Sequence, residues 1–283
     1  MTGLDGFTGR YIQAELEAKG HTVVGLSSNL TDIDAVAAEV EQVQPEAVVH
    51  LAGIAFVGHG HANAFYDVNL IGARNLLAAL AKYAPNVQSI LLASSANVYG
   101  NSTEGVLNEN VMPEPANDYA VSKLAMEHMA HLWMEQLPLF ITRPFNYSGV
   151  GQDENFLIPK IVSHFREKKA VIELGNLDVS REFGDVRSVA SSYTKLLELS
   201  PSGQTINVCT SQTYSLREVI SLCKKITGHN IELKVNPKFV RANEVRILTG
   251  DNTRLKEVIG GFQPYNLEDT LRWMLEEDTT SAK

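Results

Sequence analysis

Residues 118–123, with the sequence DYAVSK, place a tyrosine and a lysine four residues apart in a run of helical composition. On a helix, positions i and i+4 share one face, so the phenol of Tyr119 and the ammonium of Lys123 would point into the same space. A free tyrosine titrates near pH ~10, and a nearby cation favours its phenolate. We therefore expect Lys123 to lower the pKa of Tyr119, which could then exchange a proton near neutral pH. Alone, the pattern is common by chance and also suits a plain surface helix.

A second set of residues could bind a phosphate. Gly3, Gly6 and Gly9 open the chain, with Phe7 and Thr8 between them and a helical pattern after them. At a turn from strand to helix, this spacing lets the backbone approach a pyrophosphate and lays it on the helix N-terminus. Three spaced glycines also suit a flexible terminus. Only two residues precede Gly3, whereas a dinucleotide fold needs a buried strand there, so we expect the N-terminus to be incomplete.

The next apolar segment bears on the choice of dinucleotide. Residues 22–26 (TVVGL) are predicted to form a strand, and Ser27, Ser28 and Asn29 follow it. Folds that prefer NAD often place a carboxylate at this point, on the ribose 2′-hydroxyl. Without one, the sequence favours NADP, with tolerance of NAD as the alternative. Arg10 and Asn29 are candidate partners for the 2′-phosphate.

A third group of residues follows a predicted buried strand at 89–93. Residues 94–100 read SSANVYG, and in an open parallel sheet ligands bind beyond the carboxyl ends of the strands. Ser95 is well placed there to donate a hydrogen bond to a substrate carbonyl. The alternative is that Ser94 and Ser95 only cap a turn. The strand at 47–51 ends in Ala52 and Gly53, which are small enough to let a cofactor approach.

These residues need a framework that brings distant segments together. The pattern predicts strands at 22–26, 47–51, 89–93 and 139–143, alternating with helices at 32–44, 69–82 and 119–135. Such alternation is typical of an α/β protein with a doubly wound parallel sheet. Apolar residues at helical spacing in 216–227 and 267–276 are predicted to form the core of a smaller lobe.

Composition excludes several classes of function. The formal net charge of -9 argues against nucleic acid and against an anionic membrane surface. No apolar run approaches the roughly 20 residues that span a bilayer, and the first residues do not have the pattern of a secretion signal. Two cysteines are too few for a disulfide scaffold, so reduced thiols and a cytoplasmic location are expected.

Together these segments resemble the extended short-chain dehydrogenase/reductase family, which comprises nucleotide-sugar epimerases, dehydratases and reductases. The likeness rests on the glycine turn and on residues 50–53 (HLAG), 94–100 (SSANVYG), 119–123 (YAVSK) and 143–152 (RPFNYSGVGQ). It implies a Rossmann-type NAD(P)-binding domain at 1–150, rejoined by about 183–209. A smaller C-terminal lobe at 151–283 would bind a nucleotide sugar.

The resemblance also implies roles for single residues. Ser95, Tyr119 and Lys123 would be catalytic, with Lys123 also holding the nicotinamide ribose. Cofactor binding is implied for Gly3, Gly6, Phe7, Thr8, Gly9, Leu51, Ala52, Gly53, Asn69, Ala93, Tyr119, Lys123 and Pro144. Substrate binding is implied for Ser95, Asn97, Asn146, Arg181, Arg241 and Glu244.

The second half of the chain points to one branch of the family. Residues 175–186 (GNLDVSREFGDV) and 237–245 (PKFVRANEV) are similar to segments of members that act on GDP-sugars. By that likeness Arg181 and Arg241 would contact the diphosphate, and Glu244 would accept from the nucleoside ribose. Guanidinium groups match phosphate oxygens in geometry. The alternative is two arginines on a solvated face.

One departure restricts the reaction. The 4,6-dehydratases of the family carry acidic residues where this chain has Ala96 and Asn97, and neither of these can exchange a proton near pH 7. The resemblance therefore implies NAD(P)H-dependent reduction of the C4 ketone of a GDP-4-keto-6-deoxyhexose, giving GDP-D-rhamnose or its C4 epimer. The alternatives are a GDP-hexose 4-epimerase and a catalytically silent protein that senses NADP(H).

Two further expectations concern metals and partners. His59 and His61 could suggest a metal pair, but the sequence places no third ligand nearby and the family needs no metal, so we expect none. In the family, helices equivalent to 69–82 and 119–133 commonly pair two subunits. A homodimer is therefore expected, although the apolar stripes of these helices could equally serve the core of a single chain.

Overall fold

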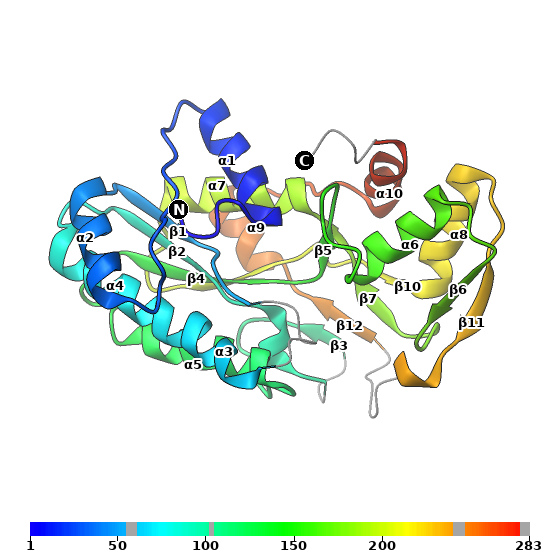
Figure 1. The fold of residues 1–283 in the computed structure, drawn as a ribbon, viewed down its shortest axis with the longest axis horizontal. Coiled ribbons are helices and arrows are strands. Elements are labelled where there is room, and N and C mark those ends of the chain that lie inside the picture. The colour runs from blue at the N-terminus through cyan, green and yellow to red at the C-terminus, as the bar shows by residue number, and fades with distance from the viewer. Residues whose placement is uncertain (55–60, 102–104, 240–246, 278–283) are drawn as a thin grey trace.

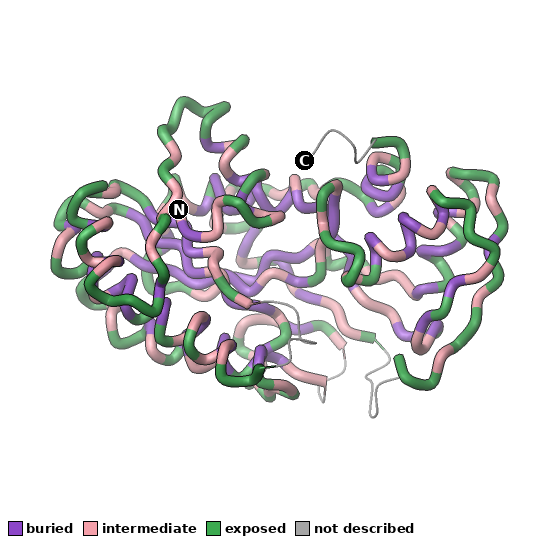
Figure 2. Tube along the Cα trace, viewed as in Figure 1, coloured by how far each residue is buried: buried purple, intermediate pink, exposed green. Residues whose placement is uncertain are grey.

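The computed structural model describes residues 1–54, 61–101, 105–239 and 247–277. Figure 1 shows a parallel sheet covered by helices on both faces, with a smaller group of strands and helices beside it. Figure 2 shows that the buried part of the chain runs along the strands of this sheet and continues into the smaller group. Within the described ranges, no helix combines the length and the apolar character needed to cross a membrane.

The main sheet is formed by β1 (Ala47–His50), β2 (Ser89–Ala93), β4 (Leu139–Pro144) and β9 (Thr205–Val208). Their order is β1-β2-β4-β9, and every neighbouring pair is parallel. Leucine, isoleucine and valine dominate these strands because helices cover both of their faces. The prediction of an α/β fold with a parallel sheet is confirmed.

The predicted strand at 22–26 is wrong for the described structure. The segment has no regular secondary structure, and two backbone bonds tie it to Met1: the Leu26 N–H donates to the Met1 carbonyl at 2.8 Å, and the terminal ammonium of Met1 donates to the Val24 carbonyl. Thr2 in turn forms a single parallel bridge with His50 of β1. Met1 and Thr2 therefore lie between this segment and β1, with isolated bonds to each in place of a ladder.

Helices cover the two faces of the main sheet (Figure 1). One face carries α2 (Ile33–Val43), α3 (Ala62–Tyr66), α4 (Ala73–Tyr83) and α5 (Asp118–His131). The other carries α1 (Phe7–Ala18), α7 (Val186–Leu199) and α9 (Thr253–Ile259). These helices bring residues from the beginning, middle and end of the chain to one sheet.

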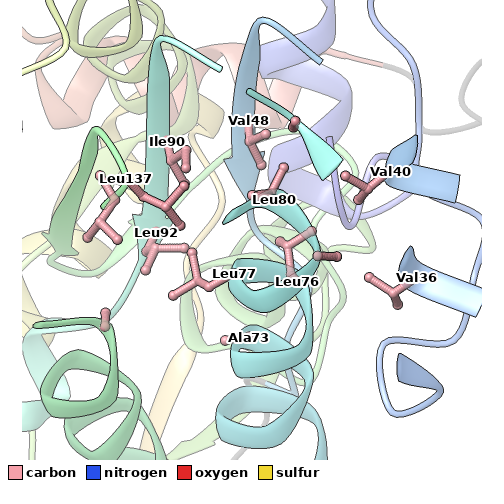
Figure 3. Close-up of a cluster of buried hydrophobic side chains, with 14 of the residues drawn as sticks. Val36, Val40, Val48, Ala73, Leu76, Leu77, Leu80, Ile90, Leu92 and Leu137 are labelled. Atoms are coloured by element: carbon pink, nitrogen blue, oxygen red, sulfur yellow. The ribbon is translucent and has the colours of Figure 1, made fainter. Parts of the chain in front are cut away.

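Figure 3 shows how α4 meets this sheet. Leu77 points toward Leu92 of β2, whereas Leu76 lies on the side of Val36 and Val40 of α2. The apolar stripes of α4 and α5 therefore serve the core of this chain. Leu132, which directly follows α5, does not belong to this core and is 76% exposed.

The smaller group contains more strands and three helices that share a core. Its strands are β3 (Gly105–Leu107), β5 (Tyr147–Ser148), β6 (Val171–Leu174), β7 (Ser180–Glu182), β8 (Gly184–Asp185), β10 (Thr213–Ser215), β11 (Glu232–Val235) and β12 (Ile247–Gly250). They pair as β10-β7-β12-β3, β11-β6 and β5-β8. The helices are α6 (Leu157–Arg166), α8 (Leu216–Thr227) and α10 (Leu267–Glu276).

Local capping explains why the sequence predicts α8 and α10 to the residue. Ser215 accepts from the Glu218 N–H while the Glu218 carboxylate accepts from the Ser215 N–H, which forms a capping box at the start of α8. Gly228, with φ of 69°, ends the helix in the left-handed conformation. Asn266 caps α10 by accepting from the Asp269 N–H.

The predicted helix at 69–82 begins differently from a regular α-helix. Residues Asp67–Gly72 form a π-helical turn that runs directly into α4. Such turns are rare and occur frequently at functional sites. Here the turn carries Asn69, whose side chain is fully buried. The periodicity of the sequence predicts a helix but cannot show the extra residue in this turn.

Candidate active site

The structure brings together the three residues that were predicted to be catalytic. Ser95 follows β2, while Tyr119 and Lys123 lie in the first two turns of α5. That helix starts where it does because Asn117 accepts from the Ala120 N–H at 2.9 Å. Tyr119 and Lys123 are 7% and 5% exposed, and Ser95 lies near enough to the Tyr119 phenol to act on its pKa. A serine, a phenol and an amine therefore meet at the carboxyl edge of the sheet.

Lys123 lies between two neighbouring strand ends. Its Nζ donates to the Ala93 carbonyl at 2.8 Å, where β2 ends. A Cβ added at Gly53 would lie 3.2 Å from this Nζ and 2.8 Å from Oδ1 of Asn69. A side chain at position 53 would therefore displace the Asn69 amide and crowd the end of Lys123.

The ionisation of the pair differs from our expectation that Lys123 lowers the pKa of Tyr119. Burial raises the pKa of Tyr119 to about 12, although the hydrogen bond from Ser95 acts to lower it. Burial also lowers the pKa of Lys123 to about 8, against the opposing effect of Glu127. Desolvation thus outweighs charge pairing here. A phenol that keeps its proton at neutral pH is suited to donate it to a forming alkoxide.

The glycine turn lies beside this site and fits a pyrophosphate. A Cβ at Gly9 would lie 2.2 Å from the Gly3 carbonyl oxygen, and one at Gly3 would lie 2.9 Å from the Ala52 N. Gly6 is the N-cap of α1 and has no side chain to bond the first amides of the helix. Those amides and the helix dipole can therefore bind an anion.

The other predicted cofactor residues lie along the same edge of the sheet. Leu51 and Ala52 directly follow β1, Ala93 ends β2, and Pro144 ends β4. Asn69 lies behind this edge: its Oδ1 accepts from the Ile54 N–H at 2.9 Å, and its Nδ2 donates to Ser122 at 3.0 Å. The Asn69 amide thus holds the loop after β1 against α5.

Tyr147 is a site residue that the sequence analysis missed. Its hydroxyl is 2.8 Å from Oγ1 of Thr8, and its ring stacks on Phe7 with the centroids 6.2 Å apart. It lies on β5, next to the predicted substrate residue Asn146. Its position next to Asn146 is the one sequence feature that could have pointed to Tyr147. The sequence does not show that Tyr147 pairs with the glycine turn, which lies 139 residues away.

The predicted substrate residues are placed only in part. The Asn97 N–H donates to Oγ of Ser95 at 3.1 Å, and the exposed Asn146 accepts from the Gly184 N–H through its carbonyl. Arg181 lies on β7, where its Nη1 donates to the Ser180 carbonyl. The predicted residues Arg241 and Glu244 lie outside the described residues, as does His59.

Glu39 of α2 places a carboxylate at the end of the 22–26 segment, where the sequence analysis expected none. One of its oxygens accepts from the N–H and Oγ of Ser27, and the other accepts from the N–H and Oγ of Ser28, at 2.5–3.1 Å. Burial acts to raise the pKa of Glu39, but these hydrogen bonds together lower it. A carboxylate therefore lies where the sequence shows none, because a helix brings it back to the end of the 22–26 segment.

The geometry can now be compared with known proteins. The model of the NAD dependent epimerase/dehydratase family matches residues 1–209, so the chain belongs to this family. A GDP-6-deoxy-D-talose 4-dehydrogenase from Aggregatibacter actinomycetemcomitans is 35% identical, over 98% of this chain and 95% of its own length. A GDP-6-deoxy-D-mannose reductase from Pseudomonas aeruginosa is also 35% identical, with the same coverage.

The fold of a solved structure agrees closely. The structure of RMD from Pseudomonas aeruginosa, complexed with NADPH, superposes with a TM-score of 0.87 at 33% identity. The alignment covers 96% of this chain and 94% of RMD. The predicted resemblance to the extended dehydrogenase/reductase family is confirmed, and so is the Rossmann-type fold.

The lowered pKa of Lys123 predicts how stability depends on pH. Between the folded pKa of about 8 and the ordinary lysine pKa of 10.5, the unfolded chain binds more protons at this residue. The free energy of unfolding of the wild type should therefore rise with pH across this window. Compared with Lys123→Met, the rise should be about 3 kcal/mol. Chemical denaturation of the cofactor-free protein at several pH values measures this difference.

Lys195→Met, at an exposed lysine of α7, is the matched control for the loss of a lysine charge. Parallel pH curves for the wild type and Lys123→Met would contradict a buried, titrating ammonium.

Proposed function

We propose that this chain is an oxidoreductase that reduces the C4 ketone of a GDP-4-keto-6-deoxyhexose with NADPH or NADH. The observation that carries the proposal is that Ser95, Tyr119 and Lys123 are buried together at the carboxyl edge of the sheet, where Lys123 bonds the end of β2. Two relatives at 35% identity are named as enzymes of GDP-6-deoxyhexoses, one a 4-dehydrogenase and one a reductase.

The residues divide the chemistry among themselves. A nicotinamide held at this edge of the sheet would supply the hydride for C4. The Ser95 hydroxyl donates to the C4 carbonyl oxygen, which gains negative charge as the carbon is reduced. Tyr119, whose phenol is neutral at pH 7, transfers its proton to that oxygen, so the ketone becomes a secondary alcohol. Lys123 binds the nicotinamide ribose. Its ammonium also stabilises the phenolate that Tyr119 becomes after it has given up its proton.

The two residues that follow Ser95 support reduction over dehydration. The turn after Ser95 presents Ala96 and the exposed Asn97, and neither side chain can take or give a proton near pH 7. The site therefore serves one alcohol–ketone carbon. This feature is shared by a 4-epimerase, so the GDP-hexose 4-epimerase remains the second candidate.

Substrate binding, domain division and assembly are parts of the same proposal. Arg181 on β7 would contact the diphosphate, together with the predicted Arg241. Residues 151–283 would form the sugar-binding lobe, apart from about 183–209, which returns to the domain formed by 1–150.

The exposed Ile71, Val121 and Leu132, on or beside α4 and α5, support a homodimer through these helices. Two free, buried cysteines support a cytoplasmic location.

The test is to supply GDP-4-keto-6-deoxy-D-mannose with NADPH or NADH and to follow nicotinamide absorbance. The configuration of the product at C4 is read by NMR. We expect oxidation of the dinucleotide in proportion to the alcohol formed. Interconversion of GDP-hexoses by protein with bound NAD and no added reductant would instead establish the epimerase. Cofactor binding without turnover would establish the silent NADP(H) sensor.

Tyr119→Phe should lower kcat by about 10²–10⁴, because the proton donor is removed while the ring is kept. Cofactor affinity should change little. Tyr193→Phe removes another buried phenol, one that accepts from Thr142 and does not meet Ser95, and is the matched control. A Tyr119→Phe enzyme that keeps near-wild-type rates on the same substrate would end the proposed mechanism.

Glu39→Gln should change the choice between the two dinucleotides. The carboxylate at Ser27 and Ser28 opposes a 2′-phosphate at the end of the 22–26 segment. Its removal should raise the ratio of kcat/KM for NADPH to that for NADH by roughly fivefold, or about 1 kcal/mol. Glu41→Gln, on an exposed position of the same helix, is the control. An unchanged ratio would show that Glu39 has no influence on the 2′ position.

A further inference from the structure

A buried ion pair lies directly behind the active site. Glu127 on α5 and Arg143 on β4 have side chains that are 3% and 7% exposed. Nη2 of Arg143 donates to Oε2 of Glu127 at 2.6 Å, and Nε donates to Oε1 at 2.9 Å. The Ser94 hydroxyl also donates to Oε1, at 2.5 Å. Both carboxylate oxygens are therefore occupied by short, charge-assisted bonds.

Fold stability alone gives little reason for this pair. Removing two charges from water costs several kcal/mol per ion, and apolar side chains of similar volume often serve a protein core as well or better. The pair also has no surface role, since almost none of it reaches solvent. Its contacts show what else it could do.

The contacts of the pair run to the elements that form the site. Ser94 immediately precedes Ser95, and Glu127 lies four residues after Lys123 on the same helix. On its other side, Nη1 of Arg143 donates to the Tyr99 hydroxyl at 3.0 Å. The pair thus joins the ends of β2 and β4 to α5, and it leads into the turn that contains Asn97.

The pair also sets the charge around Lys123. Glu127 acts to raise the pKa of Lys123, against the larger effect of burial. The titratable groups around this region are Tyr119 and Glu127 on α5, His50 on β1, Tyr99 in the turn after β2, Arg143 on β4, Tyr147 on β5 and the terminal ammonium of Met1. Burial holds the pKa of His50 at about 3 and that of Tyr119 at about 12, so both are neutral at pH 7. Glu127 is therefore the anion of this group.

We propose that Glu127 is a positioning residue for the reduction: it keeps Lys123 an ammonium and, through Ser94, holds Ser95 at the substrate carbonyl. This inference rests on the proposed function. Arg143 fixes the orientation of the buried carboxylate with two parallel bonds. One carboxylate thereby links the residue that binds the nicotinamide ribose to the residue that meets the sugar.

The test begins with Glu127→Gln, which keeps the shape of the side chain and removes its charge. Lys123 should then lose its proton at lower pH, so the alkaline limits of cofactor affinity and of kcat should move down by about one pH unit. Well above both limits this corresponds to about tenfold weaker NADPH binding. Fluorescence titration with NADPH measures the first limit, and steady-state kinetics measures the second.

Ser94→Ala separates the two parts of the role. It removes the hydrogen bond between residue 94 and Glu127, which holds the neighbouring Ser95, and it leaves the carboxylate in place. We expect a lower kcat with an unchanged alkaline limit. A shifted limit in Ser94→Ala, or an unshifted limit in Glu127→Gln, would overturn the proposal.

Loss of stability is controlled by two further variants. Glu127→Gln leaves Arg143 buried without its anion, whereas Glu127→Gln with Arg143→Met removes both charges and should recover thermal stability. The double variant should still show the shifted limit. Asp185→Asn, which breaks another buried carboxylate–arginine pair, should lower stability and leave the limit where it is in the wild type. If the alkaline limit changes in step with thermal stability across these variants, Glu127 has a purely structural role.

The NADPH titration also separates this inference from the proposed function. If the wild type turns over no GDP-sugar, the proposed reduction fails. The pH dependence of NADPH binding in the wild type and in Glu127→Gln still decides whether Glu127 controls Lys123.

Discussion

The active site depends on keeping an ammonium group out of water at the edge of a parallel sheet. Lys123 is buried, and its Nζ reaches the Ala93 carbonyl where β2 ends. A buried cation is stable only with acceptors and an anion nearby. The chain supplies both, from a strand end and from Glu127 one turn further along the same helix. The other parts of the site are arranged around this requirement.

Small residues and one unusual turn create the space for a dinucleotide. Gly53 has room for no side chain beside Lys123 and Asn69, and Gly3 and Gly9 pack against neighbouring backbone. The π-helical turn directs Asn69 at the loop after β1 and at Ser122 of α5. Backbone amides and a helix N-terminus are therefore available to the ligand at the point where three elements meet.

The glycine turn is also part of the contact between the main sheet and the smaller lobe. Phe7 stacks on Tyr147, Thr8 bonds the same phenol, and Tyr11 meets Trp273 of α10 edge to face. The Tyr11 hydroxyl donates to the Val150 carbonyl at 2.7 Å. Because aromatic side chains bury large areas, this contact holds the lobe expected to bind the sugar in a set position relative to the cofactor turn.

The sequence by itself determined the reactive residues and the order of the elements. Tyr119 and Lys123 share a helix face, and the caps at Ser215 and Asn266 give the starts of α8 and α10, because these relations span only a few residues. Tertiary structure decided the rest. Burial set the direction of the pKa of Tyr119, and a helix brought Glu39 to Ser27 across twelve residues of chain. Glu127 met Arg143 only once α5 had packed on β4. Periodicity records the neighbours on one element, whereas desolvation and contacts between elements exist only after the chain has folded.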